Sequence, residues 1–280
     1  MQDKILNKYS QYNYLNSNKK EPLVKILVSY VKPSFLFKTE ILIPIHLGRA
    51  IEREDSKYGI LSNDDLKWLH ENCIGDDDFD GNISSINRRV GFFTGTYWAW
   101  KNYDKLGNPE YFGSFGYRRI LNPNFLEHIE QYDLILPKKK DFKIETIKEQ
   151  ITRYHGERLY KNIIDIFAKI YPREIDNLTS YLNGTSGYFD ELYVMKKDIF
   201  FNFCVWILPL LFEYLKLPQI DLKNKDSRDI GFIMERLTGY YCDTLCNQPN
   251  SKYMETNVII TEKLRANINE ELLGKLRKSL

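Results

Sequence analysis

The chain has 280 residues, of which 43% are hydrophobic and 14% aromatic, so it is long enough to bury one large core and is not expected to be disordered. Forty Lys and Arg residues against 38 Asp and Glu leave a net charge of +2, which gives no reason to expect nucleic acid as a partner. Four scattered cysteines exclude a disulfide framework, and Cys242 and Cys246 lack the second ligand pair of a zinc site.

Two stretches decide the expected location of the protein. Residues 1–20 lack the unbroken apolar segment that a secretory signal needs. The most apolar stretch, residues 199–217, contains an asparagine, a proline and two charged residues, which suit a core helix better than a membrane span. We therefore predict a cytoplasmic protein, and peripheral contact with the inner face of the cytoplasmic membrane stays open as an alternative.

The first predicted elements are two strands and a short helix. Residues 23–30 form a β-branched, apolar run that predicts a buried strand, and residues 41–45 predict a second strand that opens into the loop 46–50. A helical pattern begins at Asn63 and is followed by residues 75–81, which are polar and flanked by glycine. A loop of that composition is expected at the surface.

The middle of the chain predicts one helix and two more strands. Residues 84–102 carry aromatic and small residues at helical spacing, and Asn82 or Ser84 would cap this buried helix. Residues 111–115 and 133–137 are apolar runs that predict core strands.

Strands therefore concentrate early in the chain, and helices follow from residue 144 onward. Apolar positions recur near a 3.6-residue period over 161–170, 197–217 and 229–245. This order predicts an α/β fold with a nucleotide-binding part and a mostly helical C-terminal part. Because no Gly/Pro/Ser-rich linker separates them, we assign one domain to residues 23–250, an N-terminal extension to 1–22 and a helical tail to 251–280.

Two arginines follow the strand predicted over 111–115. Arg118 and Arg119 lie at its C-terminal end, where open α/β sheets bind their ligands. Guanidinium groups bind phosphate oxygens in pairs, which favours a diphosphate as the ligand. An alternative of equal weight is that Arg118 points to solvent and Arg119 pairs with a surface carboxylate.

An acidic run in the loop 75–81 contains two Asp-x-Asp spacings. Asp76, Asp78 and Asp80 carry them, and carboxylates spaced in this way can bridge Mn²⁺ or Mg²⁺ to a diphosphate. The run does not follow an apolar strand, however, and acids in a glycine-flanked loop are typical of a solvated turn. We assign no metal ligand and expect weak or absent dependence on a divalent metal.

Several segments, among them YWAWKN at 97–102 and YFGSFGYRR at 111–119, occur together in an order and spacing known from other proteins. The remaining segments are residues 43–50, 81–84, 193–198, 206–212 and 228–237. Together they resemble a family of bacterial glycosyltransferases, formerly catalogued as a domain of unknown function, that includes galactofuranosyltransferases of O-antigen and capsule synthesis. The resemblance implies a GT-A-like fold. It also implies transfer of a sugar from a UDP-sugar donor to a glycan or lipid-linked oligosaccharide acceptor in capsule or lipopolysaccharide synthesis.

Three positions depart from the pattern of that family. Gly116 stands where a histidine is common, Glu191 stands where an asparagine is common, and the acidic residue before Asn82 is displaced to Asp80. The first two lie close to the site that the resemblance implies, so donor or acceptor identity can differ from that of the better-known members. A non-catalytic nucleotide- or sugar-binding component of a polysaccharide assembly complex is the alternative function.

The resemblance implies a donor site made of residues from the shared segments. These residues are Tyr30, His46, Gly48, Arg49, Asn82, Lys101, Tyr117, Arg118 and Arg119. Tyr30 and the segment 46–49 would border the nucleobase and ribose, while the two arginines would hold the diphosphate. A histidine such as His46, taken alone, is slightly more often a satisfied loop residue than a catalytic one, and its neighbours Gly48 and Arg49 favour a donor-site role by association.

Glycosyl transfer also needs a base for the acceptor hydroxyl. Three acids in or beside the shared segments are candidates, and we rank Glu191 first and Glu235 second, with Asp190 as the third. Glu235 could equally form an ion pair with Arg236 that fixes the architecture.

Overall fold

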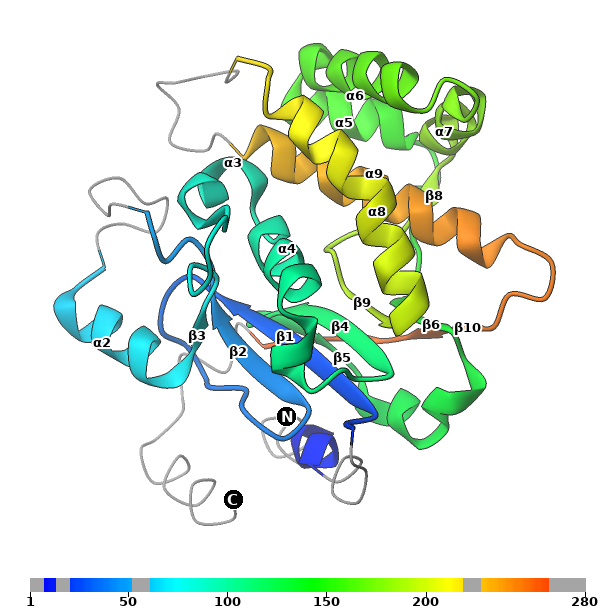
Figure 1. Ribbon diagram of the computed structural model, residues 1–280. Coiled ribbons are helices and arrows are strands. Elements are labelled where there is room, and N and C mark those ends of the chain that lie inside the picture. Colours follow the sequence, from blue (N-terminus) through cyan, green and yellow to red (C-terminus); the bar gives the residue numbers. More distant parts are fainter. Residues whose placement is uncertain (1–7, 14–20, 52–60, 219–227, 262–280) are drawn as a thin grey trace.

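A mixed β-sheet lies at the centre of the computed structural model, which describes residues 8–13, 21–51, 61–218 and 228–261 (Figure 1). Within these ranges nine strands pair in the order β10-β6-β9-β4-β1-β2-β3, with β5 beside β4 and β11 beside β5. Their bounds are β1 (Val24–Tyr30), β2 (Leu42–His46), β3 (Ile74–Gly75), β4 (Tyr111–Gly116), β5 (Arg119–Leu121), β6 (Leu134–Pro137), β9 (Tyr193–Lys196), β10 (Tyr253–Thr256) and β11 (Val258–Ile260). A separate small sheet joins β7 (Lys140–Asp141) to β8 (Ser186–Gly187).

The central strand β1 is buried on both faces. Side chains of a strand alternate between its two faces, and here each face meets its own core. Leu27 packs into the core beneath the helices, whereas Ile26 and Val28 pack into a second core on the opposite side. This double burial explains why the strand reads as a nearly continuous apolar run and why the sequence predicted it correctly.

Parallel pairing brings three strand ends together at one edge of the sheet. β1 is parallel to both β2 and β4, and its register pairs Tyr30 with His46 and Ser29 with Gly116. The carboxyl ends of β1, β2 and β4 therefore meet at this edge. In open α/β sheets this is the edge where ligands bind.

Helices cover the face of the sheet that carries Leu27. In Figure 1, α4 and α8 lie over the sheet, and α5, α6 and α7 lie together beyond α8 and α9. The helices are α2 (Asn63–Asn72), α3 (Asn87–Val90), α4 (Phe93–Lys101), α5 (Ile147–His155), α6 (Glu157–Ile170), α7 (Ile175–Asn183), α8 (Lys197–Tyr214) and α9 (Asp229–Cys246), with 3-10 turns η1 (Gln11–Asn13), η3 (Ser84–Ile86), η4 (Tyr103–Leu106) and η5 (Pro123–Gln131). Capping boxes, Ser62 with Asp65 and Thr146 with Glu149, begin α2 and α5.

The single helix predicted over 84–102 is wrong, because the chain breaks it at Gly91. This residue has φ 59° and ψ −128°, which lie outside the helical region and suit glycine. The segment is therefore divided into η3, α3 and α4. As a result Phe92, which we expected inside a helix, stands at the start of α4.

Both ends of the described chain join the domain instead of extending from it. The helical tail predicted for 251–280 is wrong over 253–260, where β10 pairs with β6 and β11 pairs with β5, because short β-branched and aromatic runs find open strand edges there. Residues 262–280 lie outside the described residues. In the predicted N-terminal extension, Tyr12 is fully buried and its hydroxyl donates a hydrogen bond to the Leu121 carbonyl at 2.7 Å.

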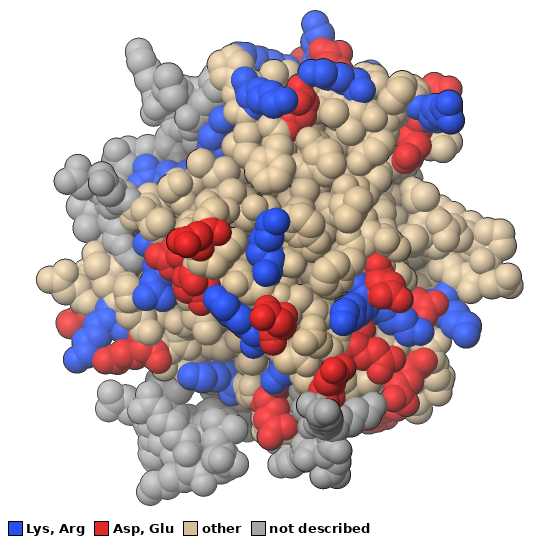
Figure 2. Space-filling model, viewed as in Figure 1, with Lys and Arg blue, Asp and Glu red and all other residues tan. Residues whose placement is uncertain are grey.

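Charges of both signs share the surface. Figure 2 shows Lys and Arg side chains interspersed with Asp and Glu on the face that carries α4 and α8. None of the helices in the described parts of the chain combines the length and hydropathy that a membrane-spanning helix requires.

Candidate functional site

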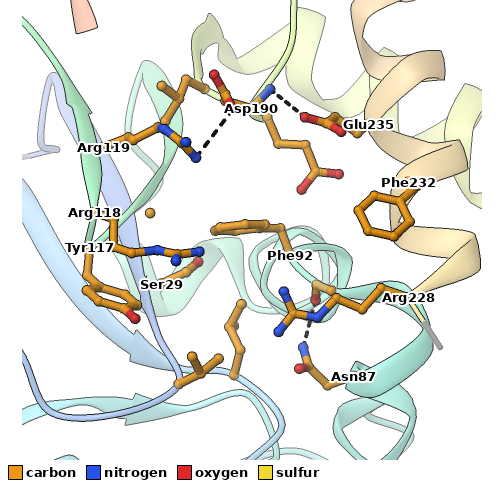
Figure 3. Close-up of a pocket in the computed structure, with 17 residues that line it drawn as sticks. Ser29, Asn87, Phe92, Tyr117, Arg118, Arg119, Asp190, Arg228, Phe232 and Glu235 are labelled. Atoms are coloured by element: carbon orange, nitrogen blue, oxygen red, sulfur yellow. Dashed lines mark hydrogen bonds and ion pairs between the residues drawn. The ribbon is translucent and has the colours of Figure 1, made fainter. Parts of the chain in front are cut away.

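A pocket of about 160 Å³ opens at the edge where the parallel strands end. Ser29 of β1 and Gly116 of β4 lie on one side of it, and Arg228 and Phe232 at the start of α9 lie on the other. Asn87 of α3 completes the wall between them. Figure 3 shows these residues around one cavity, so the strand ends and α9 enclose the site together.

Cationic side chains from two directions face this pocket. Arg118 lies in the turn after β4, and its guanidinium carbon is 5.6 Å from the centroid of the Tyr117 ring. Figure 3 shows Arg118 and Arg228 on opposite sides of the cavity. Guanidinium groups placed in this way suit the oxygens of a phosphate or diphosphate.

Arg119 is partly committed to another contact. Its side chain is 44% exposed and forms an ion pair with Asp190, with Nη1 3.4 Å from Oδ1. The other carboxylate oxygen of Asp190 accepts from Lys140 Nζ at 2.5 Å. The alternative in which Arg119 pairs with a carboxylate is therefore observed, although that carboxylate lines the pocket with it.

Glu191 places a buried carboxyl group in the lining of the pocket. The residue is 8% exposed, and within the described residues its Oε1 atom has no hydrogen-bond partner. Burial raises the pKa of this carboxyl well above its usual range, and the Glu235 carboxylate raises it further, while Arg228 and Arg236 oppose the shift. A buried oxygen without a partner is costly, so it marks a position where a ligand donor would be stabilised.

Glu191 is held there by an unusual backbone conformation. Asp190 and Glu191 both have positive φ, 72° and 51°, a conformation that costs non-glycine residues about 1–3 kcal/mol each. The backbone N–H of Asp190 donates to Glu235 Oε1 at 2.7 Å, and the Asp190 side chain is held by its two ion pairs. Surrounding contacts thus fix two successive left-handed residues beside the pocket, as is common at functional sites.

Glu235 has both carboxylate oxygens engaged. Oε1 accepts from Asp190, and Oε2 accepts from Arg236 Nη1 at 2.7 Å. Arg236 is 4% exposed and also donates to Gln150 Oε1 at 2.7 Å. The ion pair that we weighed for Glu235 is therefore present, and Glu191 is the pocket-lining acid whose buried oxygen has no hydrogen-bond partner among the described residues.

Four residues that we expected in the donor site do not line the pocket. Tyr30 is fully buried, its hydroxyl donates to the Phe35 carbonyl and accepts from Phe37 N, and its ring stacks on Tyr117 at 5.4 Å. His46 is 2% exposed. The neighbours Val31 and Leu47 line the pocket in their place.

Gly48 and Arg49 are the other two expected donor residues outside the lining. They belong to a loop that is hydrogen-bonded to Asp76 of the acidic run. Asp76 is buried and accepts from Gly48 N at 2.7 Å, from Arg49 N at 3.2 Å and from Ser84 Oγ at 2.5 Å. Burial raises the pKa of Asp76, and these hydrogen bonds oppose the shift. The carboxylate that begins the Asp-x-Asp pattern therefore fixes a loop.

The rest of the acidic run also serves local contacts. Asp78 accepts from Trp98 Nε1 at 2.5 Å and pairs with Lys105. Asn82 donates to the carbonyls of Asp77 and Phe79, which closes the loop on itself. These residues do not line the pocket, and no cluster of three His, Cys, Asp or Glu side chains suited to a metal ion occurs in the part of the chain that the structure describes. The run therefore does not fit a metal that would touch a ligand in this pocket.

Lys101 lies away from the pocket, at the surface end of α4. Its ammonium group stands 4.2 Å from the centroid of the Trp100 ring. Of the expected residues, the structure brings together Tyr117, Arg118, Arg119, Asp190, Glu191 and Glu235.

Sequence reasoning missed several lining residues, namely Ser29, Asn87, Phe92, Arg228 and Phe232. Arg228 and Phe232 belong to the shared segment 228–237, which was the signal that could have identified them. Phe92 could have been found from Gly91, because a glycine inside a helical pattern can mark a break.

The comparisons with known proteins concern the family and the fold. A family model described as a domain of unknown function, DUF4422, matches residues 25–248. Comparison with functionally curated proteins gives no match. Among solved structures, the apo structure of the bifunctional glycosyltransferase WbbM is similar, with a TM-score of 0.71 and 25% identity over 87% of this chain. This chain covers 45% of the WbbM chain, less than half of its length. The fold is thus GT-A-like, as the resemblance of the sequence implied.

Proposed function

The chain belongs to the DUF4422 family, and on that premise we propose that it is a glycosyltransferase that moves a sugar from a nucleoside diphosphate donor to a glycan acceptor. One observation carries the proposal: guanidinium groups and a buried carboxyl whose Oε1 atom has no hydrogen-bond partner among the described residues line the same pocket at the ends of the parallel strands. WbbM is a bifunctional glycosyltransferase by its title, and its similarity to this chain supports the same class of reaction.

The proposed reaction exchanges the bond between the sugar and the diphosphate for a bond between the sugar and the acceptor. The bond between the sugar anomeric carbon and the diphosphate oxygen breaks, and the nucleoside diphosphate leaves with the electron pair. The acceptor oxygen forms the new bond to that carbon and loses its proton. Arg118 and Arg228 would stabilise the charge that develops on the diphosphate, with Arg119 at the rim.

Glu191 is the residue to which we assign the acceptor proton. It lines the pocket and its buried Oε1 atom has no hydrogen-bond partner among the described residues, whereas both oxygens of Glu235 are engaged by Asp190 and Arg236. Burial raises the pKa of Glu191, and a carboxyl with a raised pKa is a stronger base once it has ionised. Asp190, which is held in two ion pairs, would position Glu191.

The finer identity of the reactants rests on the resemblance of the sequence. We propose a UDP-sugar donor, carrying galactofuranose or another hexose, and a glycan or lipid-linked oligosaccharide acceptor of capsule or lipopolysaccharide synthesis. The residues at the strand ends bind and orient the donor in this proposal, and no step requires a divalent metal.

The test is to incubate the purified protein with a panel of UDP-hexoses and follow release of UDP. Slow hydrolysis without an acceptor, accelerated by an added glycan, is the expected result. Binding of the same compounds without any UDP release, with or without glycans, would instead favour the non-catalytic binding component.

A further inference from the structure

The pocket contains an aromatic ring that has no role in the reaction proposed above. Phe92 lines the cavity directly after the break at Gly91, at the start of α4. Within the described residues it makes no ring-to-ring contact, whereas Phe93, the next residue, packs against Phe203 with centroids 6.3 Å apart. Figure 3 shows the Phe92 ring in the middle of the lining, between Arg118 and Phe232.

The end of β4 makes room for this ring. A Cβ atom on Gly116 would lie 3.1 Å from Phe92 Cζ and 3.4 Å from Cε1, which is closer than side chains normally approach. Gly116 does not have a positive φ, so it is the space and not the backbone conformation that favours glycine here. The absence of a side chain at Gly116 therefore lets the Phe92 ring lie against the strand.

The other walls complete a site of mixed character. Phe232 stacks on His155, with centroids 4.0 Å apart and an interplanar angle of 27°, so its position is fixed from behind. Glu191 lines the same cavity, and its buried Oε1 atom has no hydrogen-bond partner among the described residues. Apolar ring faces together with a buried acceptor of hydrogen bonds match a sugar ring, which has C–H faces and hydroxyl edges.

The buried carboxyl of Glu191 makes a purely apolar occupant a poorer match. A purely apolar ligand would leave the buried Glu191 oxygen unsatisfied. A nucleobase can also stack on an aromatic ring, and the affinity measurements described below distinguish it from a sugar.

We propose that Phe92 is the platform on which the sugar ring of the donor lies, with Phe232 and Glu191 as the adjoining walls. This inference rests on the proposed glycosyl transfer and goes beyond it by assigning the sugar subsite. The sugar stacks its C–H face on Phe92 and donates a hydroxyl hydrogen bond to Glu191. Phe92 and Gly116 act as one unit, because the size of residue 116 sets the position of the ring.

The test compares the affinities of UDP and of UDP-hexoses, including UDP-galactose and UDP-galactofuranose, by calorimetry. In the parent protein at least one hexose should increase the affinity over that of UDP. Phe92→Leu should reduce this gain roughly three- to tenfold and leave the affinity for UDP itself unchanged. Gly116→Ala, whose methyl group displaces the ring, should act in the same direction.

Phe201→Leu is the matched control, because this partly buried phenylalanine of α8 does not line the pocket, and it should leave both affinities unchanged. Thermal unfolding shows that each variant is folded. Two results would contradict the role of Phe92 as a sugar platform: Phe92→Leu keeps the full affinity that the hexose adds over UDP, or no hexose adds affinity in the parent. A third contradicting result is an equal loss of affinity for UDP and for the UDP-hexose in Phe92→Leu, which would indicate nucleobase stacking. Failure of the parent to bind both UDP and every UDP-hexose is a different result, because it contradicts the proposed function as well.

Discussion

Glu235 accepts a hydrogen bond from the backbone N–H of Asp190 at 2.7 Å, and this contact joins α9 to the left-handed turn that carries Glu191. The same carboxylate forms an ion pair with the buried Arg236. The position of the Glu191 carboxyl group therefore depends on α9, whose Glu235 lies 45 residues after Asp190.

The first prediction concerns this ion pair. Glu235→Gln keeps an acceptor for the Asp190 N–H but leaves the Arg236 guanidinium without its anionic partner. Removing one member of a buried pair costs about 3–5 kcal/mol, and the 19% exposure of the Glu235 side chain points to the lower end of that range. Urea denaturation measures the change. Glu71→Gln, in an exposed pair with Lys67, is the control and should change stability by less than about 0.5 kcal/mol.

The second prediction separates the two adjacent arginines. Arg119 already pairs with Asp190 and is 44% exposed, so Arg118→Ala should weaken the binding of UDP more than Arg119→Ala does. A charge-assisted hydrogen bond contributes about 1.5–3 kcal/mol, so Arg118→Ala should weaken binding roughly tenfold or more. Calorimetry with Arg153→Ala as the control, an arginine paired with Glu145 outside the pocket, measures the difference. If the double alanine variant binds UDP as tightly as the parent, the phosphate role is wrong.

The third prediction follows from the burial of Glu191. Its pKa in the folded protein is raised above the ordinary value of 4.5, so its contribution to stability is complete below about pH 4.5 and is lost as the pH rises through the raised value. Glu191→Gln removes this titration. The variant should therefore gain stability relative to the parent as the pH rises, measured by urea denaturation between about pH 5 and 9. A difference that does not change with pH would show that Glu191 is not the buried, titrating group.

The fourth prediction concerns divalent metals. Asp76 accepts hydrogen bonds from the backbone of Gly48 and Arg49, and Asp78 accepts one from Trp98. The carboxylates of the Asp-x-Asp run therefore stabilise local structure. Transfer measured with excess chelator should keep most of its rate. A complete loss that manganese reverses would show that a metal and diphosphate bind together at acids that we have not assigned.

The sequence predicted the core of the fold because burial leaves a direct pattern. The strands expected over 23–30, 41–45, 111–115 and 133–137 correspond to β1, β2, β4 and β6. The strands β9, β10 and β11 were not predicted, because their place in the sheet depends on partners far away in the chain. The break at Gly91 was missed because helical spacing continues on both sides of it.

The site was predictable where a residue lies just beyond a strand end, as Arg118 and Arg119 do. The sequence did not show which of two neighbouring residues at a strand end faces the pocket, because side chains alternate between the two faces of a strand. Ser29 and Val31 line the pocket, whereas Tyr30 between them points into the second core. The turn at Asp190 and Glu191 is held by tertiary contacts, so the sequence did not predict it, and only the resemblance indicated that these two acids belong to the site.

The most direct test of the account is the turnover of Glu191→Gln with the UDP-hexose and glycan that the parent uses. Glutamine keeps the shape of the side chain and removes its basicity, so donor affinity should stay within about twofold while turnover falls by roughly two to four orders of magnitude. Near-parental turnover in this variant, together with its loss in Glu235→Gln, would transfer the role to Glu235. Near-parental turnover in both would contradict a carboxylate base in this pocket.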